Sequence, residues 1–152
     1  MIKEKIQNDF IAAMKSKDEM AKTALSGIKA KITEAEKANG NQELTDDEVI
    51  KVITKAIKQR EESARIYAEA GRPEMAAKET MEINVLTDYM PAKMTDDEIE
   101  KELREIISSF SQVITNPQAL SGKTIGEFNK RFNGRADIAK VKSIVERMVN
   151  GF

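Results

Sequence analysis

Apolar residues recur every three to four positions along nearly the whole 152-residue chain, which is the spacing of one face of an α-helix. Segments that alternate apolar and polar residues, the pattern of a half-buried β-strand, do not occur. The pattern therefore predicts an all-α fold. The apolar positions of the first two expected helices are Ile2, Ile6, Phe10 and Met14, followed by Leu25, Ile28 and Ile32.

Polar signals predict where these helices begin and end. The charged run 15–18 separates the first two helices, and the Gly/Asn-containing run 38–41 ends the second. Residues 45–48 and 95–98 both read Thr-Asp-Asp-Glu, the pattern of a capping box. In such a box the Thr hydroxyl accepts from the Glu N–H while the Glu side chain bonds back to the Thr N–H. Each copy predicts a helix start, and we interpret the repeat as one cap used twice rather than as a duplicated domain.

A sharp corner is predicted between two helices in the middle of the chain. Gly71 can adopt the left-handed conformation that closes a helix, and Pro73 suits the first turn of the next helix. The expected buried positions are Ile50, Ile53, Ile57, Ala64 and Tyr67 before the corner, and Met75, Ile83 and Leu86 after it.

Pro91 disfavours helix at Met90, so residues 91–94 are a predicted linker. We expect an N-terminal helical bundle over residues 1–94 and a smaller C-terminal three-helix bundle over residues 95–152. The first helix of the second bundle carries Ile99, Leu103, Ile106, Ile107 and Phe110. Two short helices should follow Pro117, one of them opened by a capping box at residues 124–127. The expected features of the last helix are a turn at Asn133–Gly134, an N-cap at Asp137, and a core stripe of Ile138, Val141, Val145 and Met148.

The chain is nearly neutral, with 25 basic and 26 acidic residues, but acidic and basic residues are concentrated in different segments. Residues 96–116 hold six acids and two bases, a net of −4, whereas residues 117–152 hold seven bases and three acids, a net of +4. Positive groups at helix ends and at a glycine turn suit phosphates, although an ordinary solvated surface is the alternative interpretation. The candidate RNA-binding residues are Lys123, Lys130, Arg131, Arg135, Lys140 and Lys142.

The chain has no Cys and no His, which removes disulfides, thiolate nucleophiles, imidazole bases and the usual zinc ligands. We therefore expect no metal and no cofactor. Residues 121–124 match the end of a phosphate-binding loop, but Pro117 stands where its first glycine belongs, so we treat the match as chance. The charged N-terminus does not resemble a secretory signal, and no apolar run approaches the roughly 20 residues that cross a bilayer. A cytoplasmic protein is expected.

Two glutamates are the only acid–base candidates that we single out. Glu79 and Glu82 lie three residues apart on one expected helix, with Glu74 about a turn earlier, so paired carboxylates are conceivable. The arginines of the preceding helix and corner could instead pair with them across the hairpin, and we favour this ion network. Those arginines are Arg60, Arg65 and Arg72.

Three blocks of residues carry a resemblance to a known family. The first is Gln59–Arg60 with Ser63 and Tyr67; the second is Arg72 through Glu79, Glu82–Ile83, Val85–Leu86 and Tyr89–Met90–Pro91; the third is Gly126 with Gly134–Arg135–Ala136–Asp137. With these blocks the chain resembles the YqeY-like proteins, whose C-terminal half is shared with the tail of the GatB subunit of tRNA-dependent amidotransferases. Ser26, where a basic residue is expected, and Ile125, where Met is common, depart from the family pattern.

This resemblance implies two all-α bundles and a role connected with tRNA, because the GatB tail is held to touch the tRNA during transamidation. The family-level activity is carbon–nitrogen ligation with glutamine as amido donor, but the amidase and kinase centres lie on parts that this chain lacks. We therefore expect a tRNA-associated accessory module without catalytic residues of its own. The alternatives are an adaptor that docks on an aminoacyl-tRNA synthetase or amidotransferase, and a small acid–base enzyme built on Glu79 and Glu82.

Overall fold

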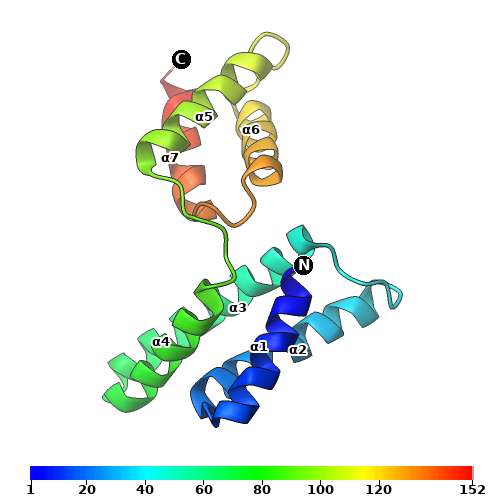
Figure 1. The fold of residues 1–152 in the computed structure, drawn as a ribbon. Helices are drawn as coiled ribbons and strands as arrows, with labels where there is room; N and C mark the ends of the chain where they lie inside the picture. The colour runs from blue at the N-terminus through cyan, green and yellow to red at the C-terminus, as the bar shows by residue number, and fades with distance from the viewer. Residues whose placement is uncertain (152) are drawn as a thin grey trace. The chain divides into compact units, whose positions relative to one another are not determined.

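The structure is a computed structural model that describes residues 1–151 (Figure 1), and within these residues the chain is all-helical without strands. The predicted all-α class is confirmed. The helices are α1 (Ile2–Ser16), α2 (Glu19–Ala38), α3 (Asp46–Glu69), α4 (Pro73–Thr87), α5 (Asp96–Phe110), α6 (Pro117–Arg131) and α7 (Ile138–Asn150).

The chain divides into two compact units, Met1–Met90 with α1–α4 and Pro91–Phe152 with α5–α7. Each unit has a hydrophobic core of its own. In the first unit α2 packs on α1, α3 and α4, and α3 packs along α4. The buried residues of this core are Ile6, Leu25, Ile28, Ile32, Leu44, Val49, Ile53, Leu86 and Tyr89.

The far end of the α3–α4 hairpin contributes little to this core, because no residue from 58 to 81 is fully buried. The expectation that Met75 belongs to the buried face is wrong, since its exposed fraction is 41%. Ala64 and Tyr67 are only partly buried. The apolar side chains of α3 are buried near the start of the helix, where α1 and α2 cover them. Further along the hairpin, α3 and α4 pack mainly on each other.

The predicted corner between α3 and α4 is confirmed. Gly71 has a φ of +73°, the left-handed conformation that favours glycine, and Pro73 is the first residue of α4. The Arg72 N–H donates to the Tyr67 carbonyl at 2.8 Å, which satisfies one of the carbonyls left open at the end of α3. The local sequence thus reverses the chain and places α4 antiparallel to α3 (Figure 1).

Thr45 begins α3 with the predicted capping box. Its hydroxyl accepts from the Glu48 N–H at 3.2 Å, and the Glu48 carboxylate accepts from the Thr45 N–H at 3.5 Å. At Thr95 the hydroxyl likewise accepts from the Glu98 N–H at 3.2 Å and begins α5. Loss of such a cap costs typically about 1 kcal/mol.

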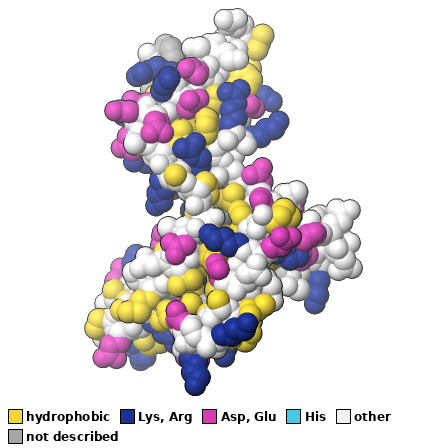
Figure 2. Space-filling view, viewed as in Figure 1, with side chains coloured by type: hydrophobic (Ala, Val, Ile, Leu, Met, Phe, Trp, Pro, Cys, Tyr) yellow, Lys and Arg dark blue, Asp and Glu magenta, His cyan; other side chains and the backbone are white. Residues whose placement is uncertain are grey.

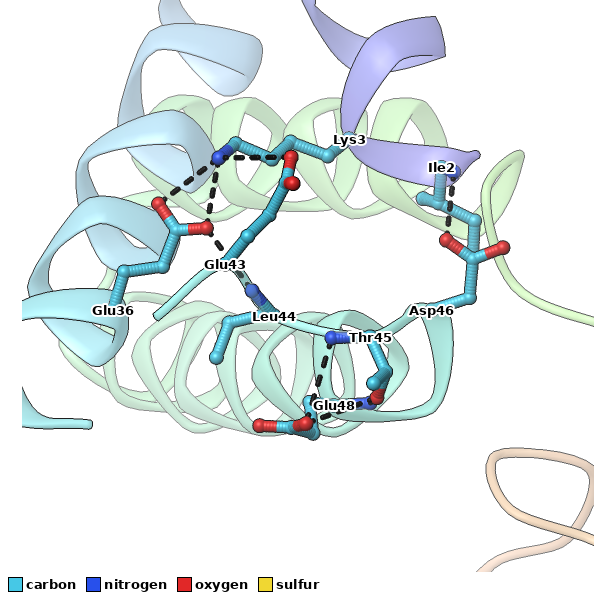
Figure 3. Close-up of polar contacts among 8 residues, drawn as sticks. All are labelled: Ile2, Lys3, Glu36, Glu43, Leu44, Thr45, Asp46 and Glu48. Atoms are coloured by element: carbon cyan, nitrogen blue, oxygen red, sulfur yellow. Dashed lines mark hydrogen bonds and ion pairs between the residues drawn. The ribbon is translucent and has the colours of Figure 1, made fainter. Parts of the chain in front are cut away.

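A polar clasp joins the start of α1 to α2 and to the loop before α3 (Figure 3). Lys3 Nζ lies 2.7 Å from Glu36 Oε2 and 3.6 Å from Glu43 Oε1, and Glu36 also accepts from the Leu44 N–H at 3.1 Å. The hydrogen bond from Lys3, followed by that from Leu44, holds the pKa of Glu36 below its ordinary value, and the bond to Glu36 raises the pKa of Lys3. On the other side of α1, the Ile2 N–H donates to Asp46 Oδ1 at 3.0 Å.

Tyr89, just after α4, is tied to the middle of α1. Its hydroxyl donates to Asp9 Oδ2 at 2.5 Å, and Lys5 Nζ lies 5.3 Å from its ring centroid. Burial of the ring, followed by the hydrogen bond to Asp9, raises the pKa of the Tyr89 phenol. The end of the first unit is therefore fastened to its first helix.

In the second unit three helices surround a core whose buried members are Met94, Ile99, Leu103, Ile106, Ile107, Leu120, Phe128, Val141, Ile144, Val145 and Val149. Asp137 caps α7 as predicted, with its carboxylate accepting from the Ala139 N–H at 2.9 Å. Ile138 does not belong to the core, because it is the first residue of α7 and is 44% exposed.

The predicted capping box at residues 124–127 is wrong, because Thr124 lies inside α6. That helix begins at Pro117, and its N-cap Asn116 accepts from the N–H groups of Gln118 and Ala119 at 2.9 and 3.1 Å. Leu120, Thr124 and Phe128 follow one another at intervals of four and all face the core. This burial on one helix face overrides the local capping pattern.

We expect Thr124→Val to stabilise the second unit. Thr124 Oγ1 is the one fully buried side-chain N or O atom among residues 1–151 that has no hydrogen-bond partner. Valine keeps the branched shape and removes the unsatisfied hydroxyl, which should raise the unfolding free energy by about 1 kcal/mol. Native-state hydrogen exchange at the α6 and α7 amides measures this unit by itself.

Thr54→Val is the matched control, because the Thr54 hydroxyl donates to the Ile50 carbonyl at 2.8 Å. Its removal should leave the α3 amides unchanged or less protected. A Thr124→Val protein with faster exchange than the parent would contradict the assignment of Thr124 as an unsatisfied core residue.

We also expect the clasp to make the first unit sensitive to acid. A carboxyl whose folded-state pKa is depressed stabilises the fold above its ordinary pKa and loses that contribution as the pH falls through the lowered value. The unfolding free energy of the parent should therefore decline below pH 4.5, the ordinary pKa of Glu36, more steeply than that of Glu36→Gln. Urea unfolding followed by tyrosine fluorescence reports this unit, since Tyr67 and Tyr89 are the only tyrosines and there is no Trp.

Glu61→Gln removes an exposed carboxylate of α3 that makes no ion pair or hydrogen bond within residues 1–151, and serves as its control. Equal pH slopes for Glu36→Gln and the parent would show that the clasp does not contribute to stability.

Candidate functional site

The residues of the α3–α4 hairpin singled out from the sequence converge on one guanidinium. Arg60 Nη1 lies 3.5 Å from Glu79 Oε2 and also donates a hydrogen bond to Glu82 Oε2. The Glu82 side chain is almost fully enclosed, with 6% of its surface exposed, whereas those of Arg60 and Glu79 are 23% and 21% exposed. The predicted ion network across the hairpin is therefore present at Arg60.

The other two arginines do not join this network. Arg65 pairs with Glu62 and Glu69 of its own helix, the second at 2.7 Å, and Arg72 Nη1 lies 3.9 Å from Met75 Sδ. Ion pairs between residues three or four positions apart on one helix surface form without any tertiary contact. An exposed arginine such as Arg65 therefore pairs within its own helix. The expectation that Arg65 and Arg72 pair with Glu79 or Glu82 is wrong.

The Arg60 network joins two helices and engages both of the glutamates that are acid–base candidates. Glu79 and Glu82 share a single guanidinium, so both carboxylates are engaged and α4 is held in register on α3. A buried carboxylate that lost this partner would be an uncompensated charge, which costs about 3–5 kcal/mol. The arrangement is one of charge compensation between two helices.

A pocket of about 270 Å³ lies beside Arg60, between α2, α3 and α4. Four of its polar lining residues, Gln59, Arg60, Ser63 and Glu79, were singled out from the sequence. The structure adds Gly27 and Lys31 of α2, which sequence reasoning missed. A Cβ atom on Gly27 would lie 3.2 Å from Arg60 Nη2, so glycine leaves room for the guanidinium. The available signal was a glycine inside a helix, where it is unfavourable without a packing reason.

The candidate RNA-binding residues are spread over one unit and differ in their surroundings. Lys123, Lys130 and Arg131 lie on α6, Arg135 in the following turn, and Lys140 and Lys142 on α7. On the face drawn in Figure 2, basic and acidic side chains of this unit are interspersed.

Half of these cations have partners within the unit. Arg131 pairs with Glu127 at 2.9 Å, Lys140 pairs with Asp96, and Arg135 Nε donates to the Ala92 carbonyl at 3.0 Å.

The other half are exposed and available. Lys130 and Lys142 make no ion pair or hydrogen bond within residues 1–151, and Lys123 Nζ lies 5.8 Å from the centroid of the Phe110 ring.

The glycine turn after α6 has a structural role. Gly134 has a φ of +77°, and the following Arg135 carbonyl accepts from the Met94 N–H at 2.8 Å. Arg135 therefore ties the segment before α5 to the α6–α7 turn through both its backbone and its side chain. Gly126, in contrast, faces open space on α6. The motif residues Tyr89 and Pro91 lie at the junction of the two units, Tyr89 as the last buried residue of the first.

Within residues 1–151, no three His, Cys, Asp or Glu side chains gather in a way that could hold a metal ion. No helix in this described part is long and apolar enough to span a bilayer.

Comparison with known proteins gives relatives over most of the chain. The profile of the YqeY-like protein family matches residues 3–149. Among curated proteins, altered inheritance of mitochondria protein 41, mitochondrial, of Clavispora lusitaniae is 31% identical over 102 residues, which are 66% of this chain and 59% of that protein. The protein of the same name from Pyrenophora tritici-repentis is 27% identical over 132 residues, 87% of this chain and 71% of the relative. That of Kluyveromyces lactis is 25% identical over 109 residues, 70% of this chain and 59% of the relative.

The aligned region is thus less than two thirds of the length of two of these relatives. The family match, in contrast, spans α1–α7 and includes the Arg60 network, the α3–α4 corner and the turn at Gly134. The chain belongs to the YqeY-like family.

Proposed function

We propose that this protein is a tRNA-associated accessory module, related to the tail of the GatB subunit, that contacts RNA through its C-terminal unit and is not catalytic by itself. Within this proposal the chain comprises an N-terminal helical bundle and a smaller C-terminal three-helix bundle, and acts in the cytoplasm. The observation that carries the proposal is the +4 segment of residues 117–152, whose cations lie on α6, α7 and the turn between them.

The cations of this unit fall into two groups for binding phosphates. Lys123, Lys130 and Lys142 are exposed and leave no carboxylate behind when they meet a phosphate. Arg131 and Lys140 would exchange a surface ion pair for one with RNA, and such pairs are worth only about 0–1 kcal/mol. We assign the first contacts to the three lysines and treat Arg131, Arg135 and Lys140 as secondary.

Shape-led, sequence-independent binding follows from this assignment. Backbone phosphates are met by point charges, while the aromatic rings of Phe128 and Phe132 pack on each other with centroids 5.0 Å apart. Phe128 is buried, so it offers no face on which a base could stack.

A second candidate function is an adaptor that docks on an aminoacyl-tRNA synthetase or amidotransferase through the N-terminal unit. The observation that favours it is a set of large apolar side chains left exposed on the α3–α4 hairpin. These are Ile66, Met75 and Met81, with exposed fractions of 51%, 41% and 53%.

The RNA proposal predicts a salt-dependent affinity for total tRNA. Three phosphate contacts give a slope of log affinity against log salt of about −2 to −3. The triple variant Lys123→Ala, Lys130→Ala, Lys142→Ala should flatten this slope towards zero and leave the helical content unchanged. Filter binding or electrophoretic shifts across a salt series measure the slope, and circular dichroism measures the helicity.

The triple variant Lys15→Ala, Lys51→Ala, Lys58→Ala is the charge-matched control, because it removes three exposed lysines from the N-terminal unit. An equal effect of the two triple variants would refute a contact confined to the C-terminal unit. Absence of tRNA binding at low salt would favour the adaptor.

The proposal also predicts that the purified protein shows no glutaminase or amide-transfer turnover. Glu79 and Glu82, the acid–base candidates, are both engaged by Arg60, and the sequence holds no Cys or His nucleophile–base pair beside them. Turnover that survives purification and disappears in Glu79→Gln would overturn the non-catalytic assignment and favour the acid–base enzyme.

A further inference from the structure

The pocket beside Arg60 belongs to the N-terminal unit and has no part in the RNA contact proposed above. Four of its polar lining side chains can donate hydrogen bonds: the Arg60 guanidinium, the Gln59 amide, the Ser63 hydroxyl and the Lys31 ammonium group. The fifth is the Glu79 carboxylate, which Arg60 already engages. An adjoining pocket of about 290 Å³ shares Lys31, Ala56 and Gln59 with it. Together the two form a hollow along the α2–α3 interface.

Arg60 is held in place and yet has donors to spare. Its contacts to Glu79 and Glu82 both use Nη1, whereas Nη2 and Nε have no hydrogen-bond partner among residues 1–151. Neither atom is sealed from solvent, because Thr124 Oγ1 is the sole buried side-chain N or O without a partner in this part of the chain. The second edge of the guanidinium is thus unpaired and not fully enclosed, in a side chain that is 23% exposed and that Glu79 and Glu82 orient.

The surroundings keep this edge open. Gly27 lies next to Nη2, where a Cβ would approach to 3.2 Å, and it is part of the pocket wall. A glycine inside a helix lowers the stability of the helix by about 1 kcal/mol relative to alanine. The space beside the Arg60 guanidinium is thus accompanied by a less stable α2.

The geometry and charge select the ligand class. Two parallel N–H groups of a guanidinium edge match the two oxygens of a carboxylate or phosphate. A dianionic phosphate would be repelled by Glu79 and Glu82 on the same guanidinium. A single negative charge can be balanced by Lys31, because its ion pair with Glu34 at 3.6 Å is solvent-exposed and therefore weak. We propose that this pocket binds a carboxylate, with Arg60 as the oriented donor and Gln59, Ser63 and Lys31 around it.

The size of the hollow and the side chains that line it limit which molecules could present the carboxylate. A pocket of about 270 Å³ accommodates a small organic acid or the last residue of a peptide. The adjoining pocket adds Ala35, Ala38 and Val52 as apolar wall, which suits a short aliphatic tail. The shared chemistry is a carboxylate on a small apolar stem, and its two sources are a free acid and a peptide C-terminus.

An NMR titration of the full-length ¹⁵N-labelled protein tests the proposal. The probes are sodium butyrate and its neutral isostere butyramide, with sodium chloride and sodium phosphate at matched ionic strength. Butyrate should produce saturable shifts of the Arg60 side-chain N–H and of the Gly27 and Ser63 amides. Butyramide and phosphate should bind at least about tenfold more weakly. An acetylated trialanine with a free C-terminus, compared with its C-terminal amide, distinguishes the peptide source.

Two variants and a control decide the interpretation. Gly27→Ala is expected to weaken butyrate binding by about tenfold or more, because its Cβ crowds Arg60 Nη2 while improving helix propensity. Gly122→Ala is the matched control, since Gly122 of α6 faces open space, and it should change nothing. Arg60→Lys keeps a cation for Glu82 but removes the planar pair of donors, and should also lose the butyrate response.

The proposal fails if butyrate causes no saturable shifts in this region, if butyramide or chloride reproduces them, or if Gly27→Ala and Arg60→Lys leave them unchanged. Failure here would not bear on tRNA binding, which is measured on another unit with other variants.

Discussion

Glu82 imposes the strongest physical constraint on the N-terminal unit, because its carboxylate is enclosed where α2, α3 and α4 meet. A buried carboxylate needs a partner, and Arg60 supplies it from the facing position of the hairpin. This pairing fixes the register of α4 on α3. It also accounts for glycine at position 27, since a Cβ at this position of α2 would lie 3.2 Å from Nη2 of the same guanidinium.

The rest of the unit is arranged around the helices that enclose this charge. The Lys3–Glu36 clasp and the Tyr89–Asp9 hydrogen bond fasten α1 to α2 and to the end of α4. The core that they surround lies near the start of α3 and the end of α4, so the far end of the hairpin is held mainly by its own two helices. The exposed apolar side chains and the open edge of Arg60 both belong to this less covered hairpin.

The C-terminal unit follows a different principle, since its charged residues are at the surface and its core is apolar. Its ion pairs at Arg131 and Lys140 are solvent-exposed and weak, so they leave the basic surface adaptable. Within residues 91–151 the one polar side chain in this core is that of Thr124, which occupies a core position on α6 without a partner for its hydroxyl. Position on the helix, and not polarity, decided its burial.

Local sequence determined most of the helices and their ends. The caps at Thr45 and Asp137 and the turn at Gly71 depend on residues within about four positions of one another, so they can be recognised without the fold. The ion network at Arg60 was also within reach, because an antiparallel hairpin must bring opposite charges on its two helices together. The helix start at Thr124 was misplaced because a short capping pattern resembles part of a buried helix face.

What the tertiary structure decided is which residues of different helices meet. The approach of Gly27 and Lys31 to Arg60 joins α2 to α3 across about thirty residues of chain, and no local pattern encodes that distance. The same holds for two of the cations: sequence showed a +4 segment, but only packing gave Arg135 and Lys140 their partners at Ala92 and Asp96, whereas the pair of Arg131 with Glu127 is local to α6. Hydrogen-bond caps act over a single turn and can be recognised from sequence, whereas burial and side-chain pairing between helices depend on how the cores pack.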